Sequence, residues 1–204
     1  FLLKMKMDKR LLENVMTSGE AAMHAINQKK FGKTFYHLGP SRDTSIFEKV
    51  KDNKTALQSC DFILCTGLFD DYENDLEHYK KILSKHISKK LICTNPDLIV
   101  HRGSVEELCA GSVAKVFEDL GGEVIYFGKP HKEIYNMCFE SNETVLAIGD
   151  NLRTDIKGAN NLKIDCIFIS DGVHRKEFNN FSELSKLLEK YDVKANFFQR
   201  ELKW

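Results

Sequence analysis

Residues 144–155 constrain the fold of this chain more than any other segment. They read Thr-Val-Leu-Ala-Ile-Gly-Asp-Asn-Leu-Arg-Thr-Asp, so an apolar run ends at Gly149-Asp150 and a second aspartate, Asp155, follows five residues later. A short apolar run closed by a turn residue predicts a buried strand. Ligands of α/β proteins bind at the carboxyl ends of such strands. The segment therefore predicts a strand that brings two carboxylates to a crevice.

Strand-like and helix-like segments alternate along the whole chain, which predicts an α/β fold. Short apolar runs predict strands at 34–38, 62–65, 91–93, 124–127, 145–148 and 166–169. Apolar residues at helical spacing, together with capping and stop signals, predict helices at 20–28, 75–86, 105–120, 130–139, 155–162 and 182–191. Ser18 or Gly19 is expected to cap the first of these helices.

The order of these elements predicts two halves. Residues 123–204 give a strand, helix, strand, helix, strand series, which is typical of a doubly wound sheet. Residues 20–122 form an α/β unit of their own. We therefore expect a core domain, to which residues 1–19 and 123–204 contribute, with a second α/β domain inserted at 20–122 as a cap.

The composition argues against several classes of protein. The 30 basic residues balance the 30 acidic ones, so no overall field attracts nucleic acid or an anionic membrane. The longest apolar runs are too short to span a bilayer. The six cysteines form no Cys-x-x-Cys pair, and four of them lie in apolar runs, which predicts reduced core thiols in a cytoplasmic protein. The usual zinc and nucleotide motifs do not occur in the sequence.

Two predicted strand ends carry side chains suited to phosphate chemistry. Asp150 and Asp155, with Asn151, offer the oxygen ligands that Mg²⁺ prefers. Lys129 lies in Gly128-Lys129-Pro130, after a strand and before a helix, where an ammonium group suits a phosphoryl group. Each feature also has a simpler interpretation. Acidic residues such as Asp155 are common in the first turn of a helix, where they stabilise the helix dipole. The pair Gly-Asp is common in turns, and a single lysine in a turn is usually exposed to solvent.

Gly128-Lys129-Pro130 and the run Gly-Asp-Asn-Leu-Arg-Thr-Asp-Ile at 149–156 closely resemble the third and fourth motifs of the haloacid dehalogenase (HAD) superfamily. The segments 94–97, 109–111 and 121–122 resemble its subfamily IIA, the NagD-like phosphatases, whose α/β cap is inserted between motifs two and three. The resemblance covers essentially the whole chain. It implies a doubly wound Rossmannoid core, incomplete here at its N-terminus, with an inserted α/β cap domain.

The resemblance also implies a Mg²⁺-dependent phosphatase with a covalent intermediate. In the family, one aspartate of an Asp-x-Asp-Gly motif attacks phosphorus and the other protonates the leaving group. By position, Lys129 would offset the charge on the nucleophile and the phosphate, and Asp150 would bind the metal. Asp155 would bind it through water or orient its surroundings, with Asn151 assisting. Such cations are needed because the phosphate oxygens and a carboxylate nucleophile repel one another.

The cap is expected to select the substrate, through residues near 94–97 and the loop 101–107. Asn95 and Asp97 are candidate substrate contacts, although Asn-Pro-Asp is equally good turn chemistry. Thr17 and Ser18 are minor candidates for phosphate binding, because hydroxyl residues after a strand usually cap a helix. They also align better with the hinge that leads to the cap.

No Asp-x-Asp-Gly occurs in the 204 residues, and the chain opens with Phe1-Leu2-Leu3. We therefore expect an N-terminally truncated HAD protein. Its full-length form would hydrolyse small phosphomonoesters such as sugar or nucleotide phosphates, whereas these 204 residues would be inactive or barely active. The expected partner is a small phosphorylated metabolite, not nucleic acid or a membrane. A homo-oligomer formed through the cap is a further possibility.

Two alternatives remain. A degenerate HAD-like protein would bind phosphate or a partner without turnover. A response-regulator receiver also uses an aspartate crevice and a lysine, but it predicts no inserted α/β unit.

Overall fold

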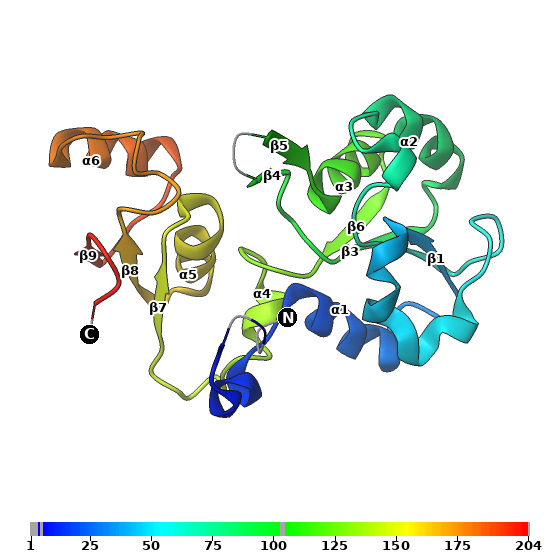
Figure 1. The fold of residues 1–204 in the computed structure, drawn as a ribbon, viewed down its shortest axis with the longest axis horizontal. Helices are drawn as coiled ribbons and strands as arrows, with labels where there is room; N and C mark the ends of the chain where they lie inside the picture. Colours follow the sequence, from blue (N-terminus) through cyan, green and yellow to red (C-terminus); the bar gives the residue numbers. More distant parts are fainter. Residues whose placement is uncertain (1–3, 5, 103–104, 204) are drawn as a thin grey trace. The chain divides into compact units, whose positions relative to one another are not determined.

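The computed structural model describes residue 4 and residues 6–102 and 105–203, so part of the predicted substrate loop at 101–107 lies outside the described residues. The chain divides into two compact units, Phe1–Gly128 and Lys129–Trp204, called here the N-terminal and the C-terminal unit. Each is built on a parallel sheet with helices packed against it (Figure 1). The predicted α/β fold is confirmed.

The N-terminal unit contains a four-stranded parallel sheet in the order β1-β2-β3-β6. Its strands are β1 (Phe35–Leu38), β2 (Phe62–Cys65), β3 (Lys90–Cys93) and β6 (Glu123–Tyr126). The register pairs Leu38 with Cys65, and Cys65 with Cys93. Every residue of β2 is buried, as expected for a central parallel strand that is covered on both faces.

Helices supply that cover on both sides of the sheet (Figure 1). On one face, α2 (Leu76–Leu83) and α3 (Ala110–Asp119) contribute Tyr79 and Phe117 to a buried cluster with Ile63 of β2. On the other face lie α1 (Ser18–Asn27) and the 3₁₀ helix Ser41–Asn53. The Phe47 ring of that 3₁₀ helix packs edge-on against Phe35, with ring centroids 5.2 Å apart.

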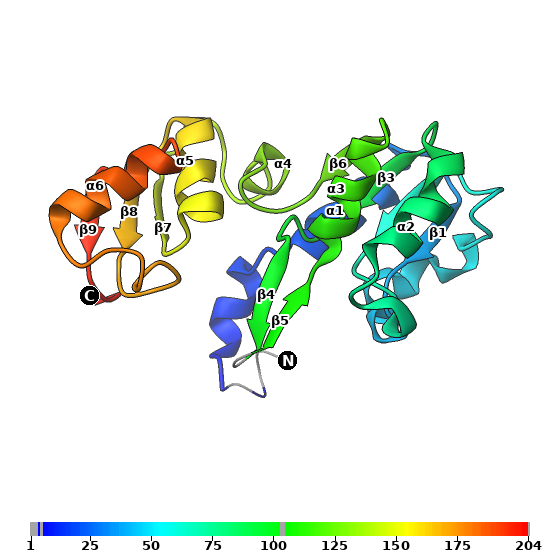
Figure 2. The ribbon, with the colours of Figure 1, turned by 90° about the horizontal axis from the view of Figure 1, so that it is seen from above.

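An antiparallel hairpin, β4 (Ile99–Arg102) and β5 (Val105–Leu108), follows β3 in the chain and precedes α3, and it extends away from both (Figure 2). The helix predicted at 105–120 is therefore wrong over its first turn. Val105 and Leu108 are three residues apart, a spacing that favours one face of a helix, and pairing with β4 overrides this local pattern. Gly111 suits the start of α3, because a Cβ there would overlap the carbonyl oxygens of residues 96 and 97.

The C-terminal unit contains three parallel strands, β7 (Leu146–Gly149), β8 (Asp165–Ile169) and β9 (Phe197–Gln199). Its helices are α4 (Lys132–Tyr135), the π-helix Leu152–Ile156, α5 (Lys157–Leu162) and α6 (Phe181–Lys190). One face of the sheet packs with the helices, and Phe168, Ile156 and Leu184 belong to that buried cluster. Leu146 and Ile148 of β7 are 46% and 38% exposed.

Three further predictions need correction. The sequence groups the strand at 124–127 with the C-terminal series, whereas β6 is hydrogen-bonded to β3, so the units divide after Gly128 and not after residue 122. The helix predicted at 130–139 is reduced to α4. The cap of α1 is Thr17, not Ser18 or Gly19. The assignment of the two units as cap and core stays a prediction.

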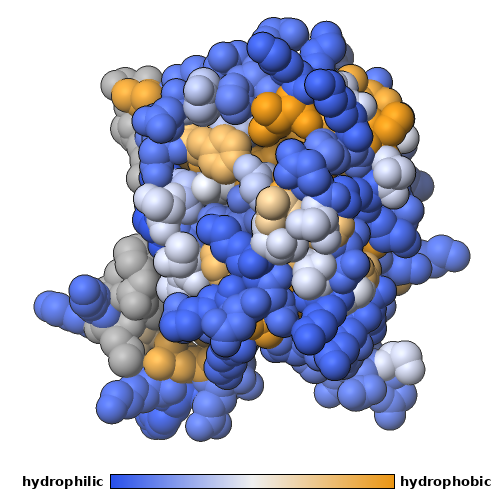
Figure 3. Space-filling view, turned by 90° about the vertical axis from the view of Figure 1, so that its right-hand side faces the viewer, coloured by the Kyte–Doolittle hydropathy of each residue, from blue (hydrophilic) through white to orange (hydrophobic). Residues whose placement is uncertain are grey.

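The face of the molecule in Figure 3 is mostly hydrophilic, with apolar side chains in separate patches. Within the described part of the chain, no helix has both the length and the apolar character needed to cross a membrane. All six cysteines are free thiols, and Cys60, Cys65, Cys93 and Cys166 are buried.

Candidate active site

Asp155 is the centre of a polar cluster in the C-terminal unit. It is 9% exposed and belongs to the π-helix that follows β7. Its Oδ1 atom accepts a hydrogen bond of 2.5 Å from Lys129 Nζ. Its Oδ2 atom accepts the backbone N–H groups of Asp150 and Asn151, at 3.2 and 3.1 Å. A buried carboxylate is tolerated only with such partners, and here they come from two distant parts of the chain.

Asp150 follows the carboxyl end of β7 and is held by a different loop. Its Oδ2 atom accepts the backbone N–H of Val173 at 3.0 Å. Two glycines allow this close packing. A Cβ on Gly149 would overlap the Asp155 side chain, and a Cβ on Gly172 would overlap the Asp150 carboxylate. The two aspartates are thus fixed by backbone contacts that larger residues would obstruct.

Asn151 and Tyr135 complete the surroundings of the two aspartates. Asn151 Oδ1 accepts the backbone N–H of Arg153 at 2.9 Å and so caps the π-helix. Burial raises the pKa of Tyr135 to about 12, and the charge of Asp155 adds to this rise. The Tyr135 hydroxyl therefore keeps its proton at neutral pH. It lies against Gly158 of α5, where a Cβ would overlap it.

The donor set of this cluster suits a hard cation, but it is small. Carboxylate and amide oxygens are the groups that Mg²⁺ prefers. Both oxygens of Asp155 are already engaged by Lys129 and the backbone, which fits a role in orienting the site more than a role as a direct ligand. Among the described residues, no group of three or more His, Cys, Asp or Glu side chains is placed to hold a metal ion. Asp150 stays the candidate for a direct ligand.

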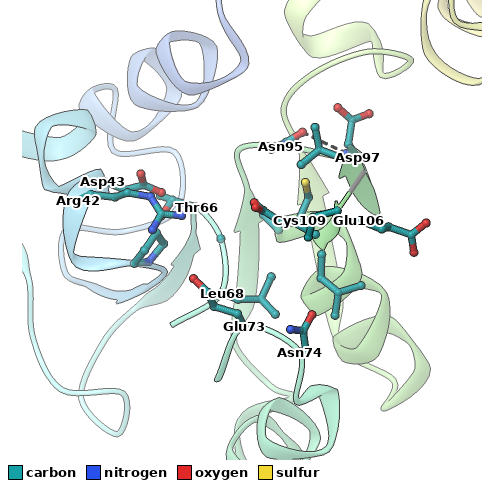
Figure 4. Close-up of a pocket in the computed structure, with 17 residues that line it drawn as sticks. Arg42, Asp43, Thr66, Leu68, Glu73, Asn74, Asn95, Asp97, Glu106 and Cys109 are labelled. Carbon is teal, nitrogen blue, oxygen red and sulfur yellow. Dashed lines mark hydrogen bonds between the residues drawn. The ribbon is translucent and has the colours of Figure 1, made fainter. Parts of the chain in front are cut away.

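Asn95 and Asp97 lie in the N-terminal unit and line a cavity of about 430 Å³ (Figure 4). The cavity opens at the carboxyl ends of β1, β2 and β3, next to the β4–β5 hairpin. The Oδ1 atom of Asn95 accepts the Asp97 backbone N–H at 3.1 Å, so the predicted turn is present. Acidic side chains outnumber basic ones in the lining, and its single arginine, Arg42, is paired with Asp70 at 3.1 Å.

Thr17 and Ser18 lie at the start of α1, also in the N-terminal unit. The Thr17 hydroxyl accepts the Glu20 backbone N–H at 3.1 Å, and the Glu20 carboxylate accepts the Thr17 N–H at 3.1 Å. This is a complete capping box. Thr17 therefore acts as a helix cap, because its hydroxyl is already hydrogen-bonded to the first turn of α1. Ser18 Oγ lies beside Gly128, where a Cβ would approach it to 2.7 Å.

The structure thus brings together Lys129, Asp150, Asn151 and Asp155 in one unit. Sequence reasoning missed the loop after β8, which supplies the Val173 contact to Asp150. A signal was available. Ser170-Asp171-Gly172 follows a third predicted strand of the same parallel series, and the carboxyl ends of such strands meet at one edge of a sheet.

Comparisons with known proteins agree with this fold. The family model described as HAD-hydrolase-like matches residues 126–190, which include all four clustered residues. A HAD-like hydrolase from Brucella suis 1330 superposes with a TM-score of 0.74 at 28% identity, over 93% of this chain and 72% of that one. A 4-nitrophenylphosphatase from Thermotoga maritima gives 0.66 at 25% identity, over 92% and 69%.

A p-nitrophenyl phosphatase from Archaeoglobus fulgidus shares the fold, with a TM-score of 0.68 at 16% identity over 90% of this chain and 70% of that one. No curated protein sequence matches the chain significantly. The fold consists of two α/β units, and the polar cluster lies in the second of them. The chain is similar to HAD-like hydrolases, as its motifs predict, and its structural neighbours are of the NagD-like, nitrophenyl phosphatase type.

Proposed function

We propose that the clustered residues form the phosphate- and metal-binding half of a Mg²⁺-dependent phosphatase that acts on small phosphomonoesters, such as sugar or nucleotide phosphates. The observation that carries the proposal is the contact between Lys129 and Asp155, anchored on the backbone of Asp150 and Asn151. Together with the Asp-x-Asp-Gly nucleophile of the family, this half-site would complete the reaction. The 204 residues, which contain no such motif, are proposed to bind without robust turnover.

Each residue has a physical role in the proposal. The Lys129 side chain is 51% exposed, so its ammonium group can meet the anionic oxygens of a phosphate while Asp155 fixes its position. Asp150 would be the direct metal ligand, Asp155 would orient the lysine and the turn, and Asn151 would assist through its amide oxygen. The bound metal would neutralise charge that develops on the phosphoryl oxygens. Prepositioned cations of this kind are the main requirement of phosphoryl transfer.

Substrate selection is assigned to the N-terminal unit, acting as the cap. Asn95 and Asp97 would contact the leaving group from the cavity at the strand ends. The acidic lining of that cavity favours a neutral or cationic leaving group over a second anionic one. For Ser18 and Thr17 we retain only a minor role in phosphate binding, because Thr17 is engaged in its capping box.

The cellular setting is also proposed. The four buried free thiols favour a reducing compartment, and we place the protein in the cytoplasm. A small phosphorylated metabolite is the proposed partner, with no nucleic acid or membrane.

A second candidate is a HAD-like protein that binds phosphate or a partner without catalysis. It is favoured by the small donor set, since the described residues hold no cluster of three or more metal-binding side chains. The two candidates share the binding half-site and differ in whether any form of the protein turns over substrate.

The binding half of the proposal is tested with inorganic phosphate and Mg²⁺, using calorimetry on the 204-residue chain. Lys129→Met should weaken phosphate binding roughly tenfold or more, because a charge-assisted hydrogen bond is lost. Lys157→Met is the matched control. Lys157 is another ion-paired lysine of the same unit, 2.9 Å from Asp192, and its loss should leave binding unchanged. Equal effects of the two substitutions would contradict the proposal.

Turnover of p-nitrophenyl phosphate by the same chain is expected to be negligible with Mg²⁺ present, because a site that lacks its covalent nucleophile loses most of its rate. Robust turnover that Asp150→Asn abolishes would show that the nucleophile is elsewhere in these residues, and would contradict the assignment of the chain as half a site.

A further inference from the structure

The loop between β8 and α6 contains a histidine that the proposed function does not use. His174 is 1% exposed, so both ring nitrogens need partners within the protein. Nε2 lies 3.1 Å from the Leu152 backbone nitrogen, and Nδ1 lies 2.7 Å from Glu177 Oε1. The His174 ring thus connects the loop after β8 to the turn after β7 that contains Asp150 and Asn151.

These contacts define the protonation of the ring. The Leu152 backbone N–H can only donate, so Nε2 must present its lone pair. The proton of the neutral ring is then on Nδ1, which donates to the Glu177 carboxylate. A carboxylate that fixes the tautomer of a histidine in this way is a common positioning device. His174 therefore acts as an acceptor for the backbone beside Asn151.

The ring is held from its other sides as well. Tyr191 packs against it in a T-shaped geometry, with centroids 5.1 Å apart. The Tyr191 hydroxyl accepts a hydrogen bond from the Arg153 guanidinium at 2.8 Å and lies 3.4 Å from Glu177 Oε2. Arg153 belongs to the π-helix that Leu152 begins. The loop, the end of α6 and the π-helix thus form one closed network of contacts.

Two adjacent loop residues contact the two residues that flank Asn151. Val173 donates its backbone N–H to Asp150 Oδ2 at 3.0 Å, and His174 accepts the backbone N–H of Leu152 at 3.1 Å. Gly172 makes this approach feasible, since a Cβ there would overlap the Asp150 carboxylate. The loop therefore restrains both the side chain of Asp150 and the backbone that carries it.

We propose that His174 is a positioning residue, which acts through Leu152 and, with Val173, holds the turn of Asp150 and Asn151 in the geometry that binds Mg²⁺. The claim that this turn binds Mg²⁺ rests on the proposed function. The claim that His174 and Val173 hold the turn in place does not. Residues that orient metal ligands from behind typically contribute about 10- to 100-fold to metal affinity.

The test compares three substitutions in the 204-residue chain. His174→Leu removes the acceptor for Leu152. His174→Gln can place a carbonyl oxygen near the position of Nε2 and serves as the rescue variant. His37→Leu is the matched control, because His37 is also buried, at 5% exposure, but lies in the N-terminal unit. Mg²⁺ affinity is followed through the amide signals of residues 150–152 in NMR titrations.

His174→Leu should weaken Mg²⁺ binding about tenfold and speed hydrogen exchange at the Leu152 amide, whereas His174→Gln should restore most of both. His37→Leu should change neither. In the unsubstituted chain, long-range nitrogen NMR should show a proton on Nδ1 and none on Nε2 of His174. A folded His174→Leu variant with unchanged affinity and exchange would overturn the proposal, as would a protonated Nε2.

If His174→Leu does not fold, Glu177→Gln provides the same test from a position whose side chain is 35% exposed. The amide no longer enforces a single tautomer, so Leu152 exchange should quicken and Mg²⁺ affinity should fall by a smaller factor. Unchanged values would overturn the proposal. If the unsubstituted chain does not bind Mg²⁺, the proposed function fails, and the positioning role is then decided by the Leu152 exchange and the His174 tautomer alone.

Discussion

The sheets of the two units are both parallel, yet they are covered differently. In the N-terminal unit, helices lie on both faces and all of β2 is buried. In the C-terminal unit, the helices pack with the face that carries Phe168, while Leu146 and Ile148 of β7 stay partly exposed. Parallel sheets are ordinarily covered on both faces. The N-terminal unit therefore buries its own sheet, whereas the C-terminal unit leaves apolar side chains uncovered among the described residues.

The carboxyl edges of the two sheets differ as well. In the N-terminal unit, the polar groups there mainly shape loops: Thr66 bonds to His37 at 2.9 Å, and Asn95 closes the turn at Asp97. In the C-terminal unit, Asp155 gathers a lysine and two backbone N–H groups. The same position in the same kind of sheet thus serves loop formation in one unit and a charged site in the other.

The difference in how helices cover the two sheets predicts the largest difference in stability between matched substitutions. Ile63→Ala, at a fully buried position of β2, should destabilise the N-terminal unit by about 4 kcal/mol. Ile148→Ala, at a position that is 38% exposed, should cost the C-terminal unit about 1 kcal/mol. Urea unfolding, followed separately in each unit by hydrogen exchange, checks the pair. Equal costs would mean that the two sheets are equally covered in solution.

A buried histidine should make the N-terminal unit sensitive to acid. Burial, with a smaller contribution from Lys54, lowers the pKa of His37 from its usual 6.5 to about 4. The unfolded chain then binds the proton more readily, so stability is full above pH 6.5 and falls as the pH drops towards 4. The loss should approach about 3 kcal/mol. Unfolding curves of the His37→Gln variant, which cannot titrate there, should lack this component; an identical pH dependence would contradict the assignment.

Glycines at the two strand ends should tolerate a methyl group unequally. Gly149→Ala places a Cβ into the Asp155 side chain and should cost about 2 kcal/mol, because packed atoms must move. Gly67, after β2, is the counterpart: a Cβ there approaches Pro40 to 3.0 Å, which a small shift can relieve. Thermal unfolding of both variants measures the difference. A Gly149→Ala protein as stable as Gly67→Ala would show that the Asp155 site is loosely packed.

The smallest effect concerns the start of α1. Thr17→Ala should destabilise the N-terminal unit by about 1 kcal/mol, because it removes the capping box with Glu20. Ser18→Ala should be close to neutral, since Ser18 does not provide the cap. Phosphate binding should be only slightly weaker in Thr17→Ala, as expected for a minor role. A large loss of phosphate affinity there would favour Thr17 as a ligand instead.

The sequence predicts the strands, and the clustering of Lys129 with the two aspartates, because both depend on local signals. Strand ends such as Gly149-Asp150 and Gly128-Lys129 are readable from an apolar run followed by a turn residue. The β4–β5 hairpin is not readable in this way, because the spacing of Val105 and Leu108 favours a helix and only the pairing with β4 makes the segment a strand. The same holds for β6, whose membership of the first sheet depends on pairing with β3.

The role of the loop after β8 also escapes sequence reasoning. Its contact with Asp150 is made by a backbone N–H, which has no side-chain signature. The acceptor role of His174 depends on a tautomer that only its two partners define. Features that depend on contact between distant segments require the fold, whereas features encoded by one segment do not.

The most direct test of the central claim is a Mg²⁺ titration of the 204-residue chain and its Asp150→Asn variant, read from backbone amide signals. Asp70→Asn is the control, since Asp70 also accepts a backbone N–H and a basic side chain, but in the N-terminal unit. The account predicts that Mg²⁺ shifts the signals of residues 149–155, that Asp150→Asn abolishes these shifts, and that Asp70→Asn leaves them intact. Shifts that persist in Asp150→Asn would contradict it.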